Sequence, residues 1–510
     1  MIDIENLPGL YDKIQTTTSV AYGGFNTNIK FSIPQKGDNM YYVGKKSYMS
    51  VQLRIIQTRD DGLTTFNLEP IINTGTRLIP TAISTPFINN NPVISLFDSL
   101  TTSMNDVTIS DNQFLQPANT LYRIMYESKE EQQTINSTNP ITLMNSYDVG
   151  TATTPYAPET AKVLTKIGSI LAPVLPTTAP NGLITPRMQY ALKQQCNFDN
   201  CQSNYLTSQI PSPIFLSDDL IHMGAGGKIE LTFMVNSNWV QNLIGIAGST
   251  TTSITGNPAQ NFRVIALPAT GVPPAATSNN TIYVAVTDFV LYMYKVPLQK
   301  EPISVPGSIR MKKWVTNLYN LTSGSSINMT VSLQDMRHMT HIIIAFLQPT
   351  GITGKSSVTD FSCGFNNTIV NNMPGVVEFI NTTVANNNIS SFYITYDKQY
   401  PNPAYTFGND PTNAMELSRA YYETLINTNA LSDRSGSMFD FSTWLQNTIF
   451  VFKTSEDYST IINQVNATIN LKAANNNQTT TAVIMGLYDE ENKFEYDAEM
   501  KMSRADRKAV

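Results

Sequence analysis

Apolar and polar side chains alternate with a period of two in segments spread along the whole chain. The pattern is clearest in Met49 to Ile55, in Ile229 to Val235 and in Phe392 to Tyr396. Successive side chains of a strand point to opposite faces, so each segment predicts a β-strand with one buried and one solvated face. Such strands are typical of antiparallel sheets that cover a core on one side.

Denser apolar runs predict strands that are buried on both faces. The longest is Ile282 to Val296, and Ile342 to Leu347 is a shorter one. Further strands are predicted at Thr448 to Lys453, Ala467 to Lys472 and Thr481 to Tyr488. Strand signals therefore cover both halves of the chain.

Helical signal is sparse. The best segment is Asn413 to Leu425, where Asn413 can cap a helix and Glu416 follows three residues later, as in a capping box. Long connections rich in turn formers separate the strands, notably Thr58 to Asn91, Ser146 to Pro186 and Gly248 to Asn280. We therefore predict an all-β fold with long loops and one or two short helices.

The chain has a weak internal duplication. A strand, a turn and an apolar strand open the first half at Phe25 to Ile56, and the same order returns at Ser326 to Leu347. Three prolines and a glycine within Pro297 to Gly307 mark a boundary between the halves. We expect an N-terminal arm at 1–20, one domain at 21–298, a second at 299–490 and a C-terminal tail at 491–510.

Charge is scarce and nearly balanced. Of the 510 residues 14% are charged, where ordinary domains carry about 25%. The formal net charge of -6 gives no general attraction to nucleic acid. Local basic clusters at Lys45 and Lys46, at Lys312 and Lys313, and at Arg504 to Lys508 are interpreted as solvated surface. The neutral Asn, Thr and Tyr surface instead favours packing against further copies of the chain.

The cysteines and the apolar runs exclude several classes of protein. Cys196, Cys201 and Cys363 are too few for a disulfide framework, and no finger-type ligand spacing follows them, so free thiols are expected. The first residues lack a basic region followed by an apolar one, so export by a signal peptide is not expected. No apolar run reaches the ~20 residues of a membrane-spanning helix, so no membrane span is expected.

Few residues of the sequence are suited to catalysis or metal binding. The only imidazoles are His222, His338 and His341, and no Gly-x-Ser-x-Gly elbow accompanies them. The paired acids Asp218 and Asp219, and the run Asp489 to Glu491, are interpreted as solvated edges, since no calcium-loop spacing surrounds them. We expect no catalytic residue, cofactor or metal site. Two carboxylates of a glycosidase can come from anywhere in a chain, so that alternative stays open.

The order of several motifs resembles that of the double jelly-roll major capsid proteins of virophages, polinton-like viruses and the adenovirus-related DNA viruses. The segments that carry the resemblance are Asn28 to Asp38 before the strand Ser47 to Ile56, Leu96 to Ile109, Tyr122 to Tyr126, Ile210 to Phe215, Lys228 to Val235, Asp288 to Val296, Ser391 to Tyr396, Ser418 to Tyr422 and Asn447 to Phe452. The resemblance implies two jelly-roll β-sandwiches in tandem, a homotrimer of pseudo-hexagonal outline in an icosahedral capsid, and penton and minor capsid proteins as partners. A β-rich scaffold or adhesin that binds protein or carbohydrate is the main alternative.

The last residues carry acids and bases with few large apolar side chains, so they cannot bury enough surface to order alone. We expect them to act as an assembly arm that pairs with a neighbouring subunit or an internal minor protein. The residues assigned to this role are Asp489, Glu490, Glu491, Lys501, Arg504, Arg507 and Lys508.

Overall fold

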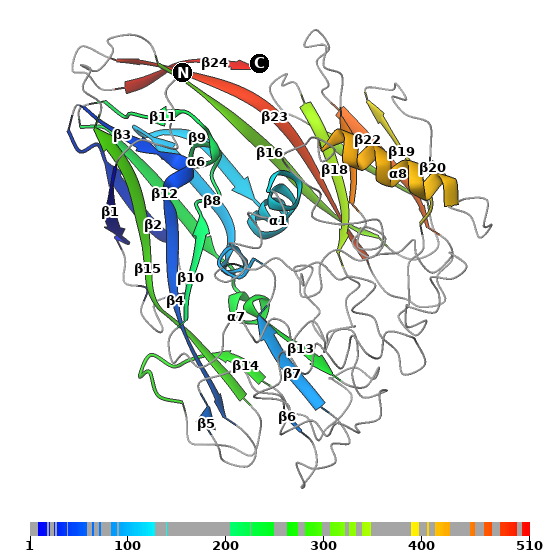
Figure 1. Cartoon of the computed structure of the whole chain (residues 1–510). Helices are drawn as coiled ribbons and strands as arrows, with labels where there is room; N and C mark the ends of the chain where they lie inside the picture. Colours follow the sequence, from blue (N-terminus) through cyan, green and yellow to red (C-terminus); the bar gives the residue numbers. More distant parts are fainter. Residues whose placement is uncertain are drawn as a thin grey trace.

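The structure is a computed structural model of the whole chain (Figure 1). The residues it describes are 9–58 (without 18–19, 21–24, 26–27 and 38), 64–65, 71–72, 83–88, 91–127, 139, 204–248 (without 225), 263–273, 281–297, 307–321, 326–332, 339–347, 389–396, 405–406, 414–428, 449–453, 464–471, 480–496 and 502–509. His338, Lys501 and the three cysteines lie outside them.

The first half of the chain runs through strands and short helices. In chain order they are β1 (Leu10–Gln15), β2 (Ile29–Pro34), β3 (Met40–Val43), β4 (Tyr48–Thr58), β5 (Thr64–Thr65), β6 (Ile71–Ile72), β7 (Ile83–Ile88), β8 (Phe97–Met104), β9 (Val107–Gln113), α1 (Leu115–Tyr126), β10 (Asn204–Gln209), α6 (Pro213–Leu216), β11 (Leu220–Ile221), β12 (Lys228–Val235), α7 (Trp239–Leu243), β13 (Ile244–Gly248), β14 (Arg263–Ala266) and β15 (Thr281–Pro297). Turns of 3-10 helix precede β4 and β8, at Gly44–Lys46 and Ile94–Leu96.

The second half has fewer elements. They are β16 (Gly307–Leu321), β17 (Ser326–Ser332), β18 (Met339–Leu347), β19 (Ile389–Tyr396), β20 (Tyr405–Thr406), α8 (Ala414–Asn427), β21 (Ile449–Lys453), β22 (Gln464–Leu471), β23 (Thr480–Tyr496) and β24 (Met502–Ala509).

Both halves obey the same strand-pairing rule. In the first half, β1, β15, β4 and β10 are neighbours in one sheet, and β2, β12, β8 and β9 in another. In the second half the sheets are β16-β23-β18-β21 and β17-β22-β19-β20. We number β1, β2, β4, β8, β9, β10, β12 and β15 of the first half from one to eight, and β16 to β23 of the second half likewise. In each half the strands of the first sheet then lie in the order 1-8-3-6, and those of the second sheet in the order 2-7-4-5.

This order, antiparallel throughout, is that of a jelly roll, in which two sheets are joined by Greek-key connections. The chain is therefore all-β and contains two jelly rolls, as predicted. We call them the first jelly roll (β1 to β15) and the second jelly roll (β16 to β23). Each also places a helix between its fifth and sixth strands, α1 in the first and α8 in the second (Figure 1).

A cluster of phenylalanines fills the first jelly roll. Phe31, Phe97 and Phe233 come from one sheet and Phe289 from the other, and each is at most 1% exposed. The ring centroids of Phe31 and Phe289 are 4.8 Å apart, and those of Phe97 and Phe289 are 5.4 Å apart. Each such side chain contributes about 2 to 3 kcal/mol by burial, so this cluster holds the two sheets together.

The second jelly roll has a mainly aliphatic core. Ile342 to Ala345 of β18 and Ala482 to Met485 of β23 are buried side by side in adjacent strands. Tyr405 of β20 crosses to the other sheet, where its ring lies 5.9 Å from that of Phe450. Buried runs of this kind explain why these strands do not alternate in polarity.

The structure confirms the predicted strands and helix. The period-two segments form β4, β12 and β19, the denser runs form β15 and β18, and the predicted helix is α8. The suspected duplication is real, because its paired segments are the second and third strands of each jelly roll. Helix α1 was missed, since Pro117 and the polar residues around it conceal a helix whose faces are almost all buried.

The end of the chain differs from the expected unpaired tail. Strand β23 continues to Tyr496, and β24 pairs with it so that Glu491 lies opposite Lys508 and Asn492 opposite Arg507. The strand pairing of a hairpin orders this segment, which composition alone does not reveal.

Candidate functional site: the contact between the two jelly rolls

The described residues contain no obvious centre for catalysis. No three His, Cys, Asp or Glu side chains among them gather as metal ligands would. His222 is buried, its Nδ1 accepts a hydrogen bond from the backbone N–H of Gly224 at 3.2 Å, and its ring lies against Tyr41. No helix of the described residues is long and apolar enough to cross a bilayer. The arrangement with most chemistry is the contact between the jelly rolls.

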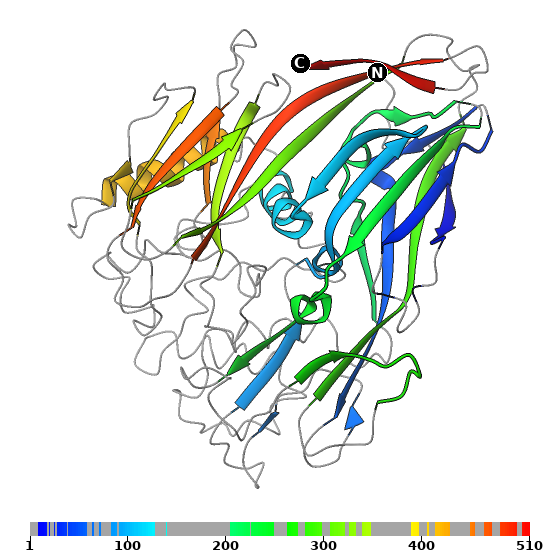
Figure 2. The ribbon, with the colours of Figure 1, turned by 180° about the vertical axis from the view of Figure 1, so that it is seen from behind.

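Strand β16 carries this contact. β16 and β23 run side by side from the second jelly roll over the first, where β16 approaches α1, α6 and β9 (Figures 1 and 2). Ile309 and Met311 are 4% and 2% exposed and belong to the same hydrophobic cluster as the core of the first jelly roll. The beginning of β16, the first strand of the second jelly roll, is thus part of the packing of the first.

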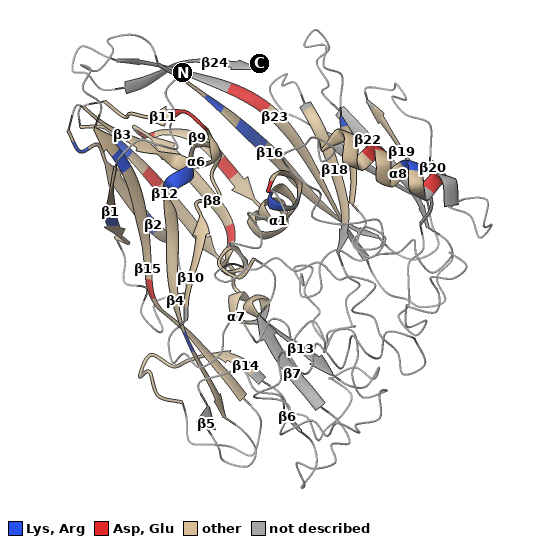
Figure 3. Cartoon of the chain, in the orientation of Figure 1, with Lys and Arg blue, Asp and Glu red and all other residues tan. Residues whose placement is uncertain are grey.

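A buried ion pair lies in this contact. Nζ of Lys313 is 2.8 Å from Oε1 of Glu490, and the side chains are 3% and 2% exposed. The same ammonium donates a hydrogen bond to the carbonyl oxygen of Ile109, in β9 of the first jelly roll. Figure 3 shows basic residues on β16 beside acidic residues on β23 where the two strands pass over α1. One cation therefore connects three strands from both halves.

This placement corrects the sequence interpretation of two clusters. Lys313 and Glu490 were both assigned to solvated surface, but both are buried because the first jelly roll covers them. Glu490 is paired with Lys313 within its own chain, and its predicted part in the assembly arm stays a prediction. The missed signal is the strand period: Met311, Lys313 and the apolar Ile309 share one face of β16.

Two tyrosines of α1 face the second jelly roll. The ring centroid of Tyr122 is 5.2 Å from that of Trp314, and Nζ of Lys312 lies 4.8 Å above the ring of Tyr126. Burial, with smaller effects of nearby acids, raises the pKa of Tyr122 to about 12. Burial also raises the pKa of Tyr126. Both phenols stay neutral, and the contact gains aromatic and cation–π stabilisation.

Two side chains of the first jelly roll form hydrogen bonds with the backbone of β16 and fix its position there. The N–H of Arg310 donates to a carboxylate oxygen of Asp219 at 2.7 Å, and the Ser217 hydroxyl donates to the carbonyl oxygen of Arg310 at 2.7 Å. Asp219, interpreted from sequence as part of a solvated edge, thus holds the other jelly roll. Asp218 beside it is exposed and pairs with Lys45.

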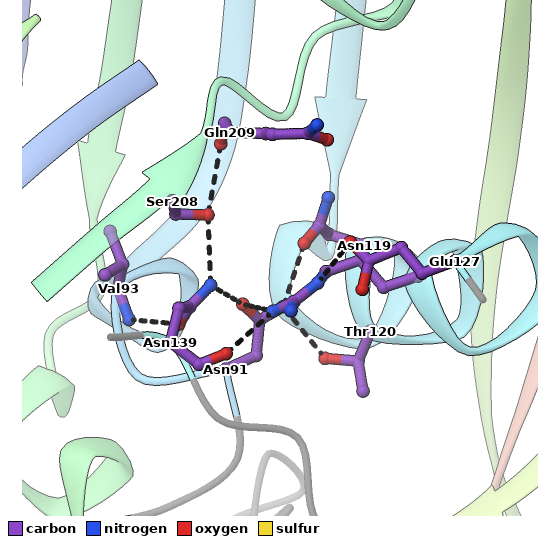
Figure 4. A network of polar contacts seen from close by, with 9 residues as sticks. Asn91, Val93, Asn119, Thr120, Glu127, Asn139, Ser208 and Gln209 are labelled. Carbon is purple, nitrogen blue, oxygen red and sulfur yellow. Dashed lines mark hydrogen bonds and ion pairs between the residues drawn. The ribbon is translucent and has the colours of Figure 1, made fainter. Parts of the chain in front are cut away.

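A buried polar network anchors α1 from the opposite side (Figure 4). Nη1 of Arg123 donates to the side-chain oxygen of Asn91 at 3.1 Å and to the carbonyl of Asn139 at 3.2 Å. The amide of Asn91 donates to Asn119 at 2.8 Å, and Asn139 donates to Ser208 at 3.0 Å. Satisfied buried networks rigidify the elements that they join, so the network positions Tyr122 and Tyr126.

Among the other predicted assembly residues, Asp489 lies opposite Lys312 in the strand register, and its charge contributes to the raised pKa of Tyr122 and Tyr126. Asp489 is half-buried in β23, Glu491 follows it, and Arg504, Arg507 and Lys508 lie in β24. Their strands form a hairpin at the end of the sheet that contains the buried ion pair. Its role in assembly stays a prediction.

Comparison with known proteins found matches among solved structures. A chain in the cryo-EM structure of the Sputnik virophage is 11% identical with a TM-score of 0.48, and the match covers 99% of this chain and 91% of that one. The mavirus major capsid protein is 11% identical with a TM-score of 0.48, and the match covers 98% of this chain and 90% of that one. The Faustovirus major capsid protein is 11% identical with a TM-score of 0.46, and the match covers 99% of this chain and 93% of that one. No family model and no curated protein matches the chain. The fold rests on the strand pairings.

Proposed function

We propose that the chain is a major capsid protein of an icosahedral DNA virus and that it forms homotrimeric capsomers of pseudo-hexagonal outline. The observation that carries the proposal is the tandem repetition of one jelly roll, with the two copies locked by buried contacts. Jelly rolls also occur in lectin domains and cupins, so the fold alone does not define the function. The tandem arrangement and the motif order of the sequence favour the capsid.

The geometry suits a hexagonal building block. Two similar units fixed side by side in each chain become six around a threefold axis, and closed rotational symmetry is the usual arrangement of homo-oligomers. The low share of charged residues limits repulsion between identical subunits.

We further propose that the domain division falls between β15 and β16. All sheet pairings described for the first jelly roll stay within 10–297, and those for the second stay within 307–509. The contact through Lys313 and Arg310 then serves as the interface between domains. Limited proteolysis should cut within 298–306 before it cuts either sandwich.

The role is structural rather than catalytic in this proposal. His222 and His341 both take part in packing, and His341 is half-buried opposite Lys453 of β21. The protein would reside in the virion capsid, with penton and minor capsid proteins as its partners. The hairpin with Glu491, Arg504, Arg507 and Lys508 would contact them or a neighbouring capsomer, and deleting 501–510 should spare trimers and weaken shell formation.

The test is the oligomeric state of the purified chain. Light scattering coupled to size exclusion should give three chains at micromolar concentration, and negative-stain images should show a hexagonal outline. A monomer that binds sugars on a glycan array would favour the adhesin, and hydrolysis of a glycan would favour the glycosidase. Either result would overturn the capsid proposal.

A further inference from the structure

The two helices that occupy equivalent positions differ in what covers them. Near the end of α1, Tyr122 and Tyr126 lie four residues apart and pack on Trp314 and Lys312. Near the end of α8, Tyr422 and Ile426 have the same spacing but are 56% and 48% exposed in the single chain. Helix positions four apart share one face, so α8 presents an uncovered apolar face where α1 has a covered one.

The opposite side of α8 is already in use. The Thr424 hydroxyl donates to the carbonyl oxygen of Ile449 at 3.3 Å, and Asn427 donates to that of Val451 at 2.7 Å. These bonds hold α8 on β21 of its own jelly roll. The exposed pair therefore faces away from its own sandwich, as the tyrosine pair of α1 does.

The first strands of the two jelly rolls can also be aligned residue by residue, because each forms an ion pair with the eighth strand of its own jelly roll. In the second jelly roll, Lys313 lies two residues after Met311, the partner of Glu490 in the strand register. In the first, Asp12 lies two residues after Leu10, the partner of Lys295, and Asp12 and Lys295 form an ion pair at 2.7 Å. The charges are exchanged, but the diagonal geometry across the first and eighth strands is the same.

This match assigns Leu10 to the position of Met311, and Tyr11 to that of Lys312. Met311 is 2% exposed and packs in the first jelly roll. Leu10 is 69% exposed and Tyr11 is 50% exposed. The ion pair beside them follows the same trend, since Asp12 and Lys295 are each 15% exposed, against 3% and 2% for Lys313 and Glu490. The edge of the first jelly roll lacks the cover that its counterpart has.

We infer that Tyr11 on β1 of one copy docks on Tyr422 and Ile426 of α8 in a second copy of this chain, as Lys312 contacts α1, and that the second copy also covers Leu10 on the other face of the strand, as the first jelly roll covers Met311. The contact repeats between chains the one that β16 and α1 make within a chain. The two surfaces lie on opposite sides of the molecule in both views, so one chain cannot join them itself (Figures 1 and 2). The inference rests on the proposed trimer and names its interface.

The distribution of exposed apolar side chains supports a second copy as the occupant. Nine large hydrophobic residues are exposed in the described part of the chain, and four of them are Leu10, Tyr11, Tyr422 and Ile426. Contiguous exposed apolar groups mark interaction sites, whereas single ones are ordinary. The internal contact shows that such surfaces of this same chain fit each other.

The first experiment places a charge in each surface. Tyr422→Asp with Ile426→Asp, and separately Leu10→Asp with Tyr11→Asp, should each raise the dissociation constant of the trimer about 100-fold or more, because buried apolar anchors dominate interface energies. Circular dichroism should show unchanged folding, since all four side chains are exposed. The control is Met234→Asp, which charges a 51% exposed residue elsewhere on the first jelly roll and should leave the trimer intact.

The second experiment tests the pairing itself. With Cys196, Cys201 and Cys363 replaced by Ser, Tyr11→Cys combined with Ile426→Cys should give disulfide-linked trimers on oxidation. Tyr205→Cys with Ile426→Cys is the control, because Tyr205 lies on β10 at the other edge of the same sheet. Native trimers that survive both Asp pairs and do not cross-link would overturn this interface and leave the proposed function standing. A native chain that is monomeric would overturn both.

Discussion

The two jelly rolls have the same strand order, yet the helix and the ion pair at equivalent positions are buried to different extents. In the first, α1 is buried between a polar network and the second jelly roll; in the second, α8 is held by a few side-chain bonds and has one bare face. The ion pair between first and eighth strands is buried in the second jelly roll and partly open in the first. Burial at equivalent positions is therefore set by what covers the strand, not by the strand itself.

The largest effect is expected at the buried ion pair. Lys313→Met leaves the Glu490 carboxylate in an apolar contact and should lower the free energy of unfolding by about 3 to 5 kcal/mol. The matched change Lys295→Met in the first jelly roll should lower it by only about 1 kcal/mol, because Nζ of Lys36 stays 3.4 Å from the Asp12 carboxylate. Chemical denaturation measures both.

A double variant sharpens this comparison. Lys313→Met with Glu490→Met replaces the pair by apolar side chains and should recover most of the loss, since a buried ion pair contributes little beyond satisfying its own partners. If the double variant is no more stable than Lys313→Met alone, the bond to the Ile109 carbonyl is what holds the two jelly rolls together.

The next largest effect is expected at the buried polar network that anchors α1. Asn91 has a positive φ of 51° and its side chain bonds with four others, those of Asn119, Thr120, Arg123 and Asn139, so Asn91→Gly keeps the backbone conformation and removes the bonds. The expected loss is about 2 to 4 kcal/mol, because buried partners are left unsatisfied. Hydrogen exchange should then quicken in α1 and leave α8 unchanged. Equal quickening in both helices would mean that the network stabilises the whole chain.

His341 gives the second jelly roll a pH dependence. Burial first, and then Lys312 and Lys453, lower its pKa from 6.5 to about 4. Above pH 6.5 the imidazole is neutral in both states and has no effect. As the pH falls from 6.5 to 4, only the unfolded state binds the proton, so stability should fall by about 2 to 3 kcal/mol. Thermal unfolding of His341→Gln should lack this part of the slope.

The smallest effect concerns the anchoring of α8. Thr424→Val keeps the shape and removes the hydroxyl that donates to the carbonyl oxygens of Ala420 and Ile449. The expected loss is about 1 kcal/mol, read from the midpoint of urea unfolding. Ser418→Ala, on the exposed side of the same helix, is the control and should change stability by less than about 0.5 kcal/mol.

Local pattern was enough to predict most elements of this protein. Alternation in Met49 to Ile55 and the apolar run at Ile282 to Val296 determine strands and their buried faces, because side-chain direction repeats every two residues. The cap predicted at Asn413 places the start of a helix next to Ala414, where α8 begins, although Asn413 itself lies outside the described residues. The order of these signals also pointed to a tandem jelly roll.

Contacts between distant segments decided the rest. Nothing near Lys313 or Glu490 in the sequence shows that another sandwich lies over them, and nothing near Tyr422 shows that its side of α8 stays open. The polar face of helix α1, with Gln116, Asn119, Thr120 and Arg123, is buried in a network instead of lying in solvent, and only the tertiary structure shows what encloses it. Which strand pairs with which, and which face is covered, depend on contacts between residues up to some 280 positions apart, such as Asp12 with Lys295. The sequence alone therefore determined the elements, and tertiary packing determined which of their charges and apolar faces are buried.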